Sequence, residues 1–256
     1  MSVYRKAGIE LRLGDWREVL ADVEPDAVIT DPPYSERTHS GYNHGCDQVK
    51  SATGQDTRQQ LKYESIASLD VEAFALEWLT RSRGWVCVMN DHTAAPAFEQ
   101  AAKSAGRYSF APLPIIQKRP RLIGDGPSSW AVYLYVARPR SVAYSRWGCL
   151  PGAYFSQCDK TGIVAGAKPI QLMRQIIRDY TKPGDLVCDP CAGGATTLIA
   201  AAMEGRRAIG SEIDPATFEK AAKRIERTTI TPPLIGLPQQ KPAEQTGINF
   251  EEKAAT

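Results

Sequence analysis

The stretch "DLVCDPCAGGATT", residues 185–197, joins an apolar run to an acidic residue, a glycine turn and the start of an apolar helix. A buried strand that passes directly into a helix has this pattern, and an acid and glycines at the turn are typical of a nucleoside-cofactor site. Glu212 ends the next apolar run about 20 residues later, where a ribose-binding acid is expected. The stretch has neither the lysine of a phosphate-binding loop nor a clean GxGxxG, so it does not favour a nicotinamide cofactor.

Strand-like and helix-like segments alternate along most of the chain. Short apolar runs typical of buried strands lie at residues 26–30, 84–90, 110–118, 130–137, 185–189 and 207–213. Helical spacing, capping residues or terminal glycines mark residues 68–83, 93–106, 168–184, 195–205 and 215–227. This alternation predicts an α/β fold with a mostly parallel, twisted sheet, helices on both faces and an antiparallel edge at 110–137.

Composition is that of an ordinary globular protein. The chain has 256 residues, of which 43% are hydrophobic and 23% charged, so one catalytic domain over 1–228 is expected, with a flexible tail at 229–256. No apolar run is long enough to cross a membrane and no signal peptide is evident, which predicts a cytoplasmic protein without membrane contact. The six cysteines are expected to be reduced thiols.

A second stretch, "DAVITDPPYSE" (residues 26–36), raises a different question, because its apolar run ends in Asp31, Pro32, Pro33 and Tyr34. Two prolines fix φ and remove two backbone donors, which leaves rigidly held carbonyl acceptors. An amino group flipped out of a nucleic acid could donate to the Asp31 carboxylate and the Pro32 carbonyl while Tyr34 stacks on the base. A simple turn that ends a strand is the alternative interpretation.

Together the two stretches resemble the amino-group DNA methyltransferases that use S-adenosylmethionine, in the permuted order with the catalytic motif first. The family's (Asn/Asp/Ser)-Pro-Pro-(Tyr/Phe/Trp) pattern is matched by residues 31–34. Its Asp-Pro-Phe-x-Gly-x-Gly-Thr-Thr pattern is matched by "DPCAGGATT" except that Cys191 replaces Phe and Ala195 replaces the second Gly. The resemblance implies a Rossmann-like methyltransferase fold and methyl transfer to the N6 of adenine, with the N4 of cytosine as the runner-up.

The resemblance also implies site residues. Asp31, Pro32, Pro33 and Tyr34 would be catalytic. The residues implied for cofactor binding are Asp15, Lys168, Pro169, Asp189, Pro190, Cys191, Gly193, Thr196, Glu212 and Ile213. Strands that end in Asp31 and Asp189 are expected to be neighbours at the switch point of the sheet, which would bring the target amine to the sulfonium methyl of the cofactor.

Double-stranded DNA is the expected partner. A polar loop at 35–66 is predicted to be mobile and to bind DNA, and residues 115–167 should hold edge strands and a small target-recognition region. The residues predicted to contact DNA are Arg37, His39, Tyr42, Lys118, Arg119, Arg121, Trp130 and Arg146. Because this target-recognition region is small, we expect a short or degenerate target site. The protein could be either a monomer or a homodimer.

Several alternatives remain open at this level. Cys188 and Cys191 form a Cys-x-x-Cys but are expected to be small core residues, and His39, His44 and Cys46 could bind a metal, although no metal is expected. Trp130 could equally be a core residue at the start of a strand. Methylation of an amine in RNA or protein, or a nucleic-acid-binding module that has lost catalysis, are the other possible functions.

Overall fold

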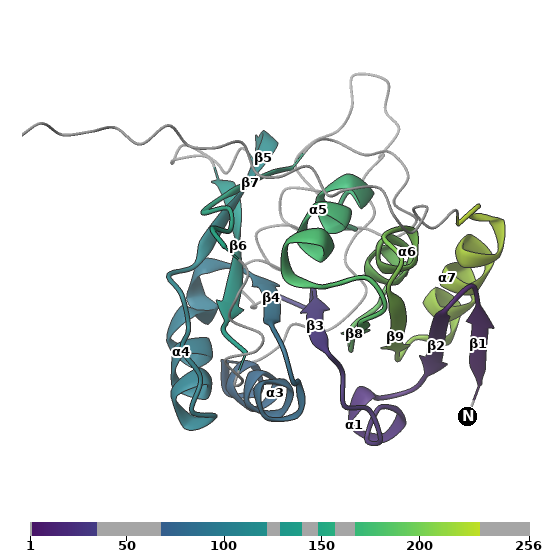
Figure 1. The fold of residues 1–256 in the computed structure, drawn as a ribbon, viewed down its shortest axis with the longest axis horizontal. Coiled ribbons are helices and arrows are strands. Elements are labelled where there is room, and N and C mark those ends of the chain that lie inside the picture. The colour runs from purple at the N-terminus through teal and green to yellow at the C-terminus, as the bar shows by residue number, and fades with distance from the viewer. Residues whose placement is uncertain (1, 35–67, 122–128, 140–147, 157–166, 231–256) are drawn as a thin grey trace, which may run out of the picture.

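The computed structural model describes residues 2–34, 68–121, 129–139, 148–156 and 167–230, and builds them around one nine-stranded sheet of order β1-β2-β9-β8-β3-β4-β6-β5-β7 (Figure 1). The strands are β1 (Val3–Lys6), β2 (Ile9–Leu13), β3 (Ala27–Thr30), β4 (Val86–Asn90), β5 (Leu113–Arg121), β6 (Ser129–Ala137), β7 (Tyr154–Ser156), β8 (Leu186–Asp189) and β9 (Arg207–Glu212). The central strands β2, β9, β8, β3 and β4 run parallel, so the predicted mostly parallel α/β sheet is confirmed.

Helices cover both faces of this sheet. They are α1 (Trp16–Val19), α3 (Ser68–Arg81), the 3-10 turn η1 (His92–Ala94), α4 (Ala95–Ser104), α5 (Ile170–Tyr180), α6 (Thr196–Met203) and α7 (Pro215–Arg227). One hydrophobic cluster joins α5, α6 and α7 to one face, and a second joins α1, α3 and α4 to the other. None of the helices formed by the described residues is long and apolar enough to cross a membrane.

The helices form where the sequence places apolar residues at helical spacing. In α5 the buried positions are Leu172, Met173, Ile176, Ile177 and Tyr180, which form one stripe that packs on the sheet. Helix α7 begins where the Asp214 side chain accepts a hydrogen bond from the Thr217 backbone amide and Pro215 occupies the first turn. Its bounds agree with the predicted helix at 215–227.

The two edges of the sheet differ from the prediction. The expected antiparallel pair, β5 and β6, is present, but the three-residue strand β7 pairs in parallel with β5 and forms the outer edge. At the other end β1 pairs antiparallel with β2, and both β1 and the short helix α1 were absent from the prediction. Strand β1 contains Tyr, Arg and Lys and is nowhere fully buried, so it lacks the apolar run that marks the central strands.

The connections leaving β8 and β3 run towards opposite edges of the sheet, although the two strands are parallel. From β8 the chain crosses through α6 to β9 on one side, and from β3 it crosses through α3 to β4 on the other. These two strands are themselves paired, with Ala27 opposite Val187 and Val28 opposite Cys188. A crevice at the carboxyl ends of such strands is where open α/β sheets bind ligands.

Gly210 allows β8 and β9 to approach closely below the glycine turn. A Cβ at this position would lie 2.6 Å from the Asp189 carbonyl oxygen and 3.1 Å from side-chain atoms of Ala192 and Leu198. The first of these contacts is to backbone, which cannot move aside as a flexible side chain can. Residue 210 must therefore be glycine for the strand ends to keep their positions.

We expect Gly210→Ala to lower the free energy of unfolding by about 1–3 kcal/mol, the usual cost of overpacking. Gly152→Ala is the matched control, because a Cβ there meets nothing within 4 Å. The control should change stability by no more than about 0.5 kcal/mol. Urea denaturation of both variants measures the difference, and equal effects would contradict the close approach at Gly210.

Candidate active site

Four acidic residues line the carboxyl ends of four adjacent parallel strands. Asp15 follows β2, Glu212 ends β9, Asp189 ends β8 and Asp31 follows β3. The strand pairing continues into this region, because the Gly14 amide donates to the Glu212 carbonyl at 3.0 Å. The structure thus brings together acids that lie up to about 200 residues apart in the chain.

A buried hydrogen bond joins the ends of β3 and β8. The Thr30 hydroxyl donates to Asp189 Oδ1 at 2.7 Å, and the Cys191 amide donates to the same oxygen at 3.1 Å. Asp189 is 1% exposed, and burial raises its pKa to about 6 despite these hydrogen bonds and one from Thr197. The predicted adjacency of the strands that end in Asp31 and Asp189 is confirmed.

The turn between β8 and α6 contains two residues with a positive φ. Gly193 has a φ of 48° and Ala195 a φ of 61°, so Ala195 adopts the left-handed conformation that glycine takes most easily. The Arg224 guanidinium of α7 donates to the Gly194 carbonyl at 2.7 Å and to Thr196 Oγ1 at 2.8 Å. The turn therefore keeps its shape although Ala195 replaces the second glycine of the family pattern. Arg224, which the sequence analysis did not identify, stabilises this turn.

Glu212 closes the turn from the neighbouring strand. Its carboxylate accepts from the Asp214 amide at 2.9 Å and from the Gly193 amide, while burial raises its pKa. The next residue, Ile213, is a large apolar side chain that is 68% exposed. An acidic side chain and an adjacent free apolar surface are thus available beside the glycine turn.

The remaining residues predicted for the cofactor have structural contacts of their own. Asp15 caps α1 by accepting from the Arg17 amide at 2.8 Å, and it also pairs with the Arg17 guanidinium at 3.1 Å. The Pro190 carbonyl accepts from the Ser211 hydroxyl at 2.7 Å. Cys191 is half-buried and Thr196 is buried at the start of α6. Pro169 occupies the N-cap position of α5 but makes no side-chain capping hydrogen bond.

Lys168 contacts the other half of the site. Its ammonium lies 2.5 Å from Asp31 Oδ2 and 5.0 Å from the centre of the Tyr34 ring. The resemblance grouped Lys168 with the cofactor residues, whereas in the structure it binds the predicted catalytic residues. No local pattern could have indicated this contact, because its partners are 137 and 134 positions away in the sequence.

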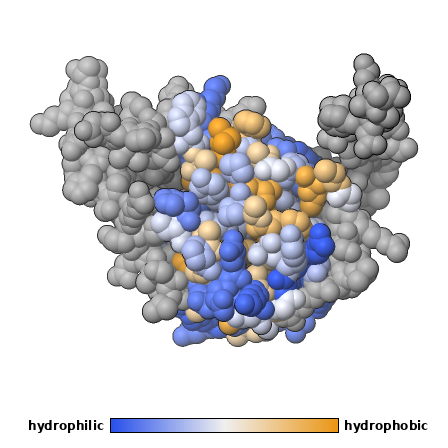
Figure 2. Space-filling view, turned by 90° about the vertical axis from the view of Figure 1, so that its left-hand side faces the viewer, coloured by the Kyte–Doolittle hydropathy of each residue, from blue (hydrophilic) through white to orange (hydrophobic). Residues whose placement is uncertain are grey.

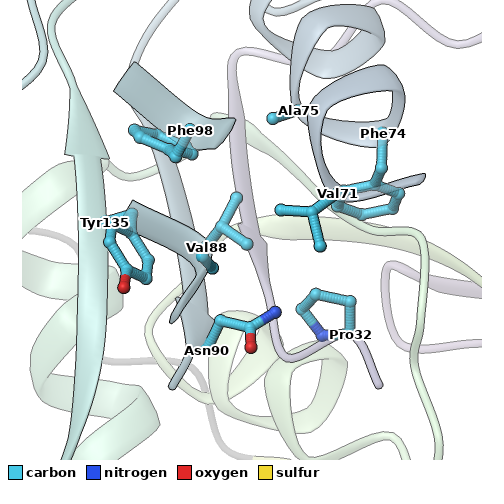
Figure 3. Close-up of a pocket in the computed structure, with 9 residues that line it drawn as sticks. Pro32, Val71, Phe74, Ala75, Val88, Asn90, Phe98 and Tyr135 are labelled. Carbon is cyan, nitrogen blue, oxygen red and sulfur yellow. The ribbon is translucent and has the colours of Figure 1, made fainter. Parts of the chain in front are cut away.

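A small, mostly apolar cavity lies beneath Pro32, with Val71, Phe74, Val88 and Tyr135 in its wall (Figure 3). Asn90, at the end of β4, also lines the cavity and is 1% exposed. Its side-chain oxygen accepts from the Asp91 amide at 2.8 Å, but its Nδ2 has no partner among the described residues. Sequence analysis did not single out Asn90, whose place follows from the pairing of β4 with β3.

Part of the chain matches the model of a known protein family. The profile of the N6/N4 DNA methylase family matches residues 152–223, which include Lys168, the glycine turn and Glu212. Over these residues the chain is similar to that family.

Curated relatives match a similarly short part of the chain. The type II methyltransferase M.MthZI of Methanothermobacter thermautotrophicus is 42% identical over 64 residues, which are 25% of this chain and 18% of that protein. The DNA adenine methyltransferase YhdJ of Escherichia coli is 39% identical over 59 residues, which are 23% of this chain and 20% of that protein. The match thus spans only about a fifth of either relative.

Solved structures extend the likeness to the whole fold. The M1.HpyAVI–SAM complex superposes with a TM-score of 0.62 at 17% identity, covering 85% of this chain and 98% of that one. The PvuII cytosine-N4-specific DNA methyltransferase gives a TM-score of 0.61 at 14% identity, covering 87% and 88%. At such low identity these matches establish the methyltransferase fold of the described sheet.

The residues predicted to contact DNA are only partly described. Lys118 is exposed on β5, and Trp130 is 52% exposed on β6, so the interpretation of Trp130 as a core residue is wrong. Figure 2 shows that the end of the molecule with α4 and β5–β7 carries apolar as well as polar surface. Outside the described residues or side chains lie the 35–66 loop with Arg37, His39 and Tyr42, the side chains of Arg119 and Arg121, Arg146, and nearly all of the tail, 231–256.

The cysteines of the described region do not form a metal site. Cys188 is buried and Cys191 half-buried, and burial raises the pKa of both thiols well above their usual value. Within the described ranges no three His, Cys, Asp or Glu side chains are arranged to hold a metal ion. His39, His44 and Cys46, the other metal candidates, lie outside these ranges.

Burial of Asp189 predicts a pH-dependent stability. Because its pKa is raised from 3.8 to about 6, ionisation costs free energy in the folded state, and stability is lost as pH rises from about 4 to about 6. Asp189→Asn has no such loss. The unfolding free energy of Asp189→Asn relative to wild type should therefore rise between pH 4 and pH 8, by something on the order of 1–3 kcal/mol.

Asp22→Asn provides a control of opposite sign, measured by urea denaturation at the same pH values. The Arg12 guanidinium, 2.6 Å away, lowers the pKa of Asp22, so this carboxylate adds stability that is lost as pH falls. Its effect should be small because Asp22 is exposed. A difference for Asp189→Asn that stays constant with pH would contradict the raised pKa.

Proposed function

We propose that this protein is an S-adenosylmethionine-dependent DNA methyltransferase that acts on an exocyclic amino group of a flipped-out base. The observation that carries the proposal is the pairing of β3 with β8, fixed by the buried Thr30–Asp189 hydrogen bond. This pairing sets the Asp-Pro-Pro-Tyr segment directly beside the glycine turn. A target amine and a cofactor held at these two strand ends would be neighbours.

The residues at the glycine turn suit S-adenosylmethionine. The cofactor would supply an electrophilic methyl group with a thioether as leaving group. The partly exposed carboxylate of Glu212 suits its ribose hydroxyls, and the exposed side chain of Ile213 suits the face of its adenine ring. Asp189, which is buried, would shape the methionine end together with Gly193. M1.HpyAVI and TTHA0409 of Thermus thermophilus, which share the fold, have been solved with this cofactor.

The Asp-Pro-Pro-Tyr segment would hold the target amine. We assign the Asp31 carboxylate and the Pro32 carbonyl as acceptors for its N–H groups, with Tyr34 stacked on the base. Hydrogen bonds from the amine to these acceptors make its nitrogen a better nucleophile, because electron density moves from the ring towards the nitrogen. Such positioned acceptors are typically worth about 10²- to 10⁴-fold in rate.

Adenine N6 is our preferred target because the first residue of the Asp-Pro-Pro-Tyr motif is Asp31. An aspartate at this position is typical of adenine-specific enzymes in the family that the sequence resembles. Cytosine N4 is the second candidate, and the fold is shared with a cytosine-N4-specific enzyme. Amines in RNA or protein would present a similar donor to Asp31 and Pro32. The small reader between β6 and α5 favours a short or degenerate target site in double-stranded DNA.

Incubation of the protein with methyl-labelled S-adenosylmethionine and either duplex DNA, RNA or protein tests this function. We expect the label to appear in DNA. Digestion of that DNA to nucleosides, followed by mass spectrometry, should detect N6-methyldeoxyadenosine. Detection of N4-methylcytosine would change the target base to cytosine and leave the proposed DNA methyltransferase activity intact. Label confined to RNA or protein, or in none of the three, would reject the proposed function.

We expect Asp31→Ala to lower kcat by at least about 100-fold, because it removes the carboxylate acceptor of the amine. Affinity for S-adenosylmethionine should stay within about threefold of wild type, because Asp31 is assigned to the target and not to the cofactor. Steady-state methylation assays and calorimetry measure the two effects. Substantial remaining activity in Asp31→Ala would remove Asp31 from the mechanism.

Glu212→Ala should weaken cofactor binding by about 1.5–3 kcal/mol, the usual contribution of a hydrogen bond to a charged group. Glu219→Ala is the control, because this glutamate lies on the exposed side of α7. Calorimetric titration with S-adenosylmethionine compares the two variants. An unchanged dissociation constant in Glu212→Ala would show that Glu212 only closes the turn.

A further inference from the structure

The two oxygens of the Asp31 carboxylate have different surroundings. Oδ2 accepts from the Lys168 ammonium at 2.5 Å. Oδ1 is shielded from solvent and has no hydrogen-bond partner among the described residues. A carboxylate oxygen that is shielded from water and lacks a donor is unfavourable, so the entry of a donor group at this point would be stabilising.

Lys168 contacts both side chains that flank the double proline. Its ammonium lies 5.0 Å from the centre of the Tyr34 ring, within the range of a cation–π interaction. The side chain of Lys168 is only 15% exposed, and that of Asp31 23%, so this ion pair is better protected from solvent than a surface pair. One cation therefore fixes the acid and the ring of the Asp-Pro-Pro-Tyr segment at the same time.

The backbone that carries Lys168 is well anchored. Lys168 directly precedes Pro169, the N-cap of α5, and α5 packs on the sheet through Leu172, Met173 and Ile176. A group held by a packed helix keeps its partner in place better than a group on a free loop. The position of Asp31 thus depends on a helix that is 137 residues further along the chain.

We infer that Lys168 is a positioning residue for the target amine and not a cofactor ligand. It holds Asp31 through Oδ2, so that Oδ1 is the acceptor left for the amine, and it orients the Tyr34 ring for stacking. The inference rests on the proposed function, because it names the residue that prepares Asp31 for that reaction. The contribution of Lys168 to kcat should depend on the negative charge of Asp31.

A double-mutant cycle of Asp31→Asn and Lys168→Met tests this dependence. The amide of Asp31→Asn keeps an acceptor oxygen but no charge for the ammonium to hold. In the wild-type background Lys168→Met should lower kcat by about 10- to 100-fold, as misplacement of a reacting group does. In the Asp31→Asn background the same substitution should lower kcat by less than about threefold.

Three further measurements separate positioning from other roles. The dissociation constant for S-adenosylmethionine, from calorimetry, should stay within about threefold in Lys168→Met. Lys168→Arg should recover much of the lost kcat, because a guanidinium can still pair with Asp31. Lys223→Met is the matched control and should leave kcat unchanged, because Lys223 is an exposed residue of α7 that pairs only weakly with Glu219.

Each outcome decides the matter. Independent, multiplying losses in the double mutant, or a cofactor dissociation constant raised more than about tenfold with kcat unchanged, would overturn the inference while leaving the proposed function intact. A wild-type protein that methylates none of the offered polymers would reject the proposed function and the inference with it. Thermal unfolding shows whether Lys168→Met is folded, and Lys168→Gln takes its place in the cycle if it is not.

Discussion

The hydrogen bond from the Thr30 hydroxyl to the Asp189 carboxylate is the contact on which the site depends. It lies where β3 and β8 pair, at the point from which the chain crosses the sheet in opposite directions. The connection that leaves β8 passes through the glycine turn, and the connection that leaves β3 begins with the Asp-Pro-Pro-Tyr segment. If this pairing slipped by one residue, Asp31 and Asp189 would point to different faces and the site would not form.

The structure stabilises these neighbouring acids in different ways. Asp189 is buried, its pKa is raised, and it is stabilised by neutral donors, namely the Thr30 hydroxyl and the Cys191 amide. Asp31 has an ion pair with Lys168 instead. Asp31 also contributes to the raised pKa of Asp189, because two carboxylates at adjacent strand ends repel each other. A cation on the Asp31 side and neutral donors on the Asp189 side therefore suit a site in which the two acids hold different groups.

Much of this could be predicted from the sequence, because buried strands and amphipathic helices leave local patterns. Strands β3, β4, β8 and β9, helix α7 and the adjacency of the strands that end at Asp31 and Asp189 were predicted correctly. Strand β1 was missed because it is a partly exposed edge strand, and β7 because it has only three residues. The contacts of Lys168 and the place of Asn90 could not be predicted, since they arise from packing between segments distant in sequence.

The part of the sheet around the glycine turn is assembled from both ends of the described chain. Strand β2, near the N-terminus, pairs in parallel with β9, and the Tyr4 hydroxyl of β1 donates to Glu226 near the end of α7. These contacts join residues roughly 200 positions apart, and such contacts cost chain entropy before they give any stabilisation. The acids after β2, β9 and β8 can therefore form one row only when segments from both ends of the described chain have paired, which couples the formation of the site to long-range folding.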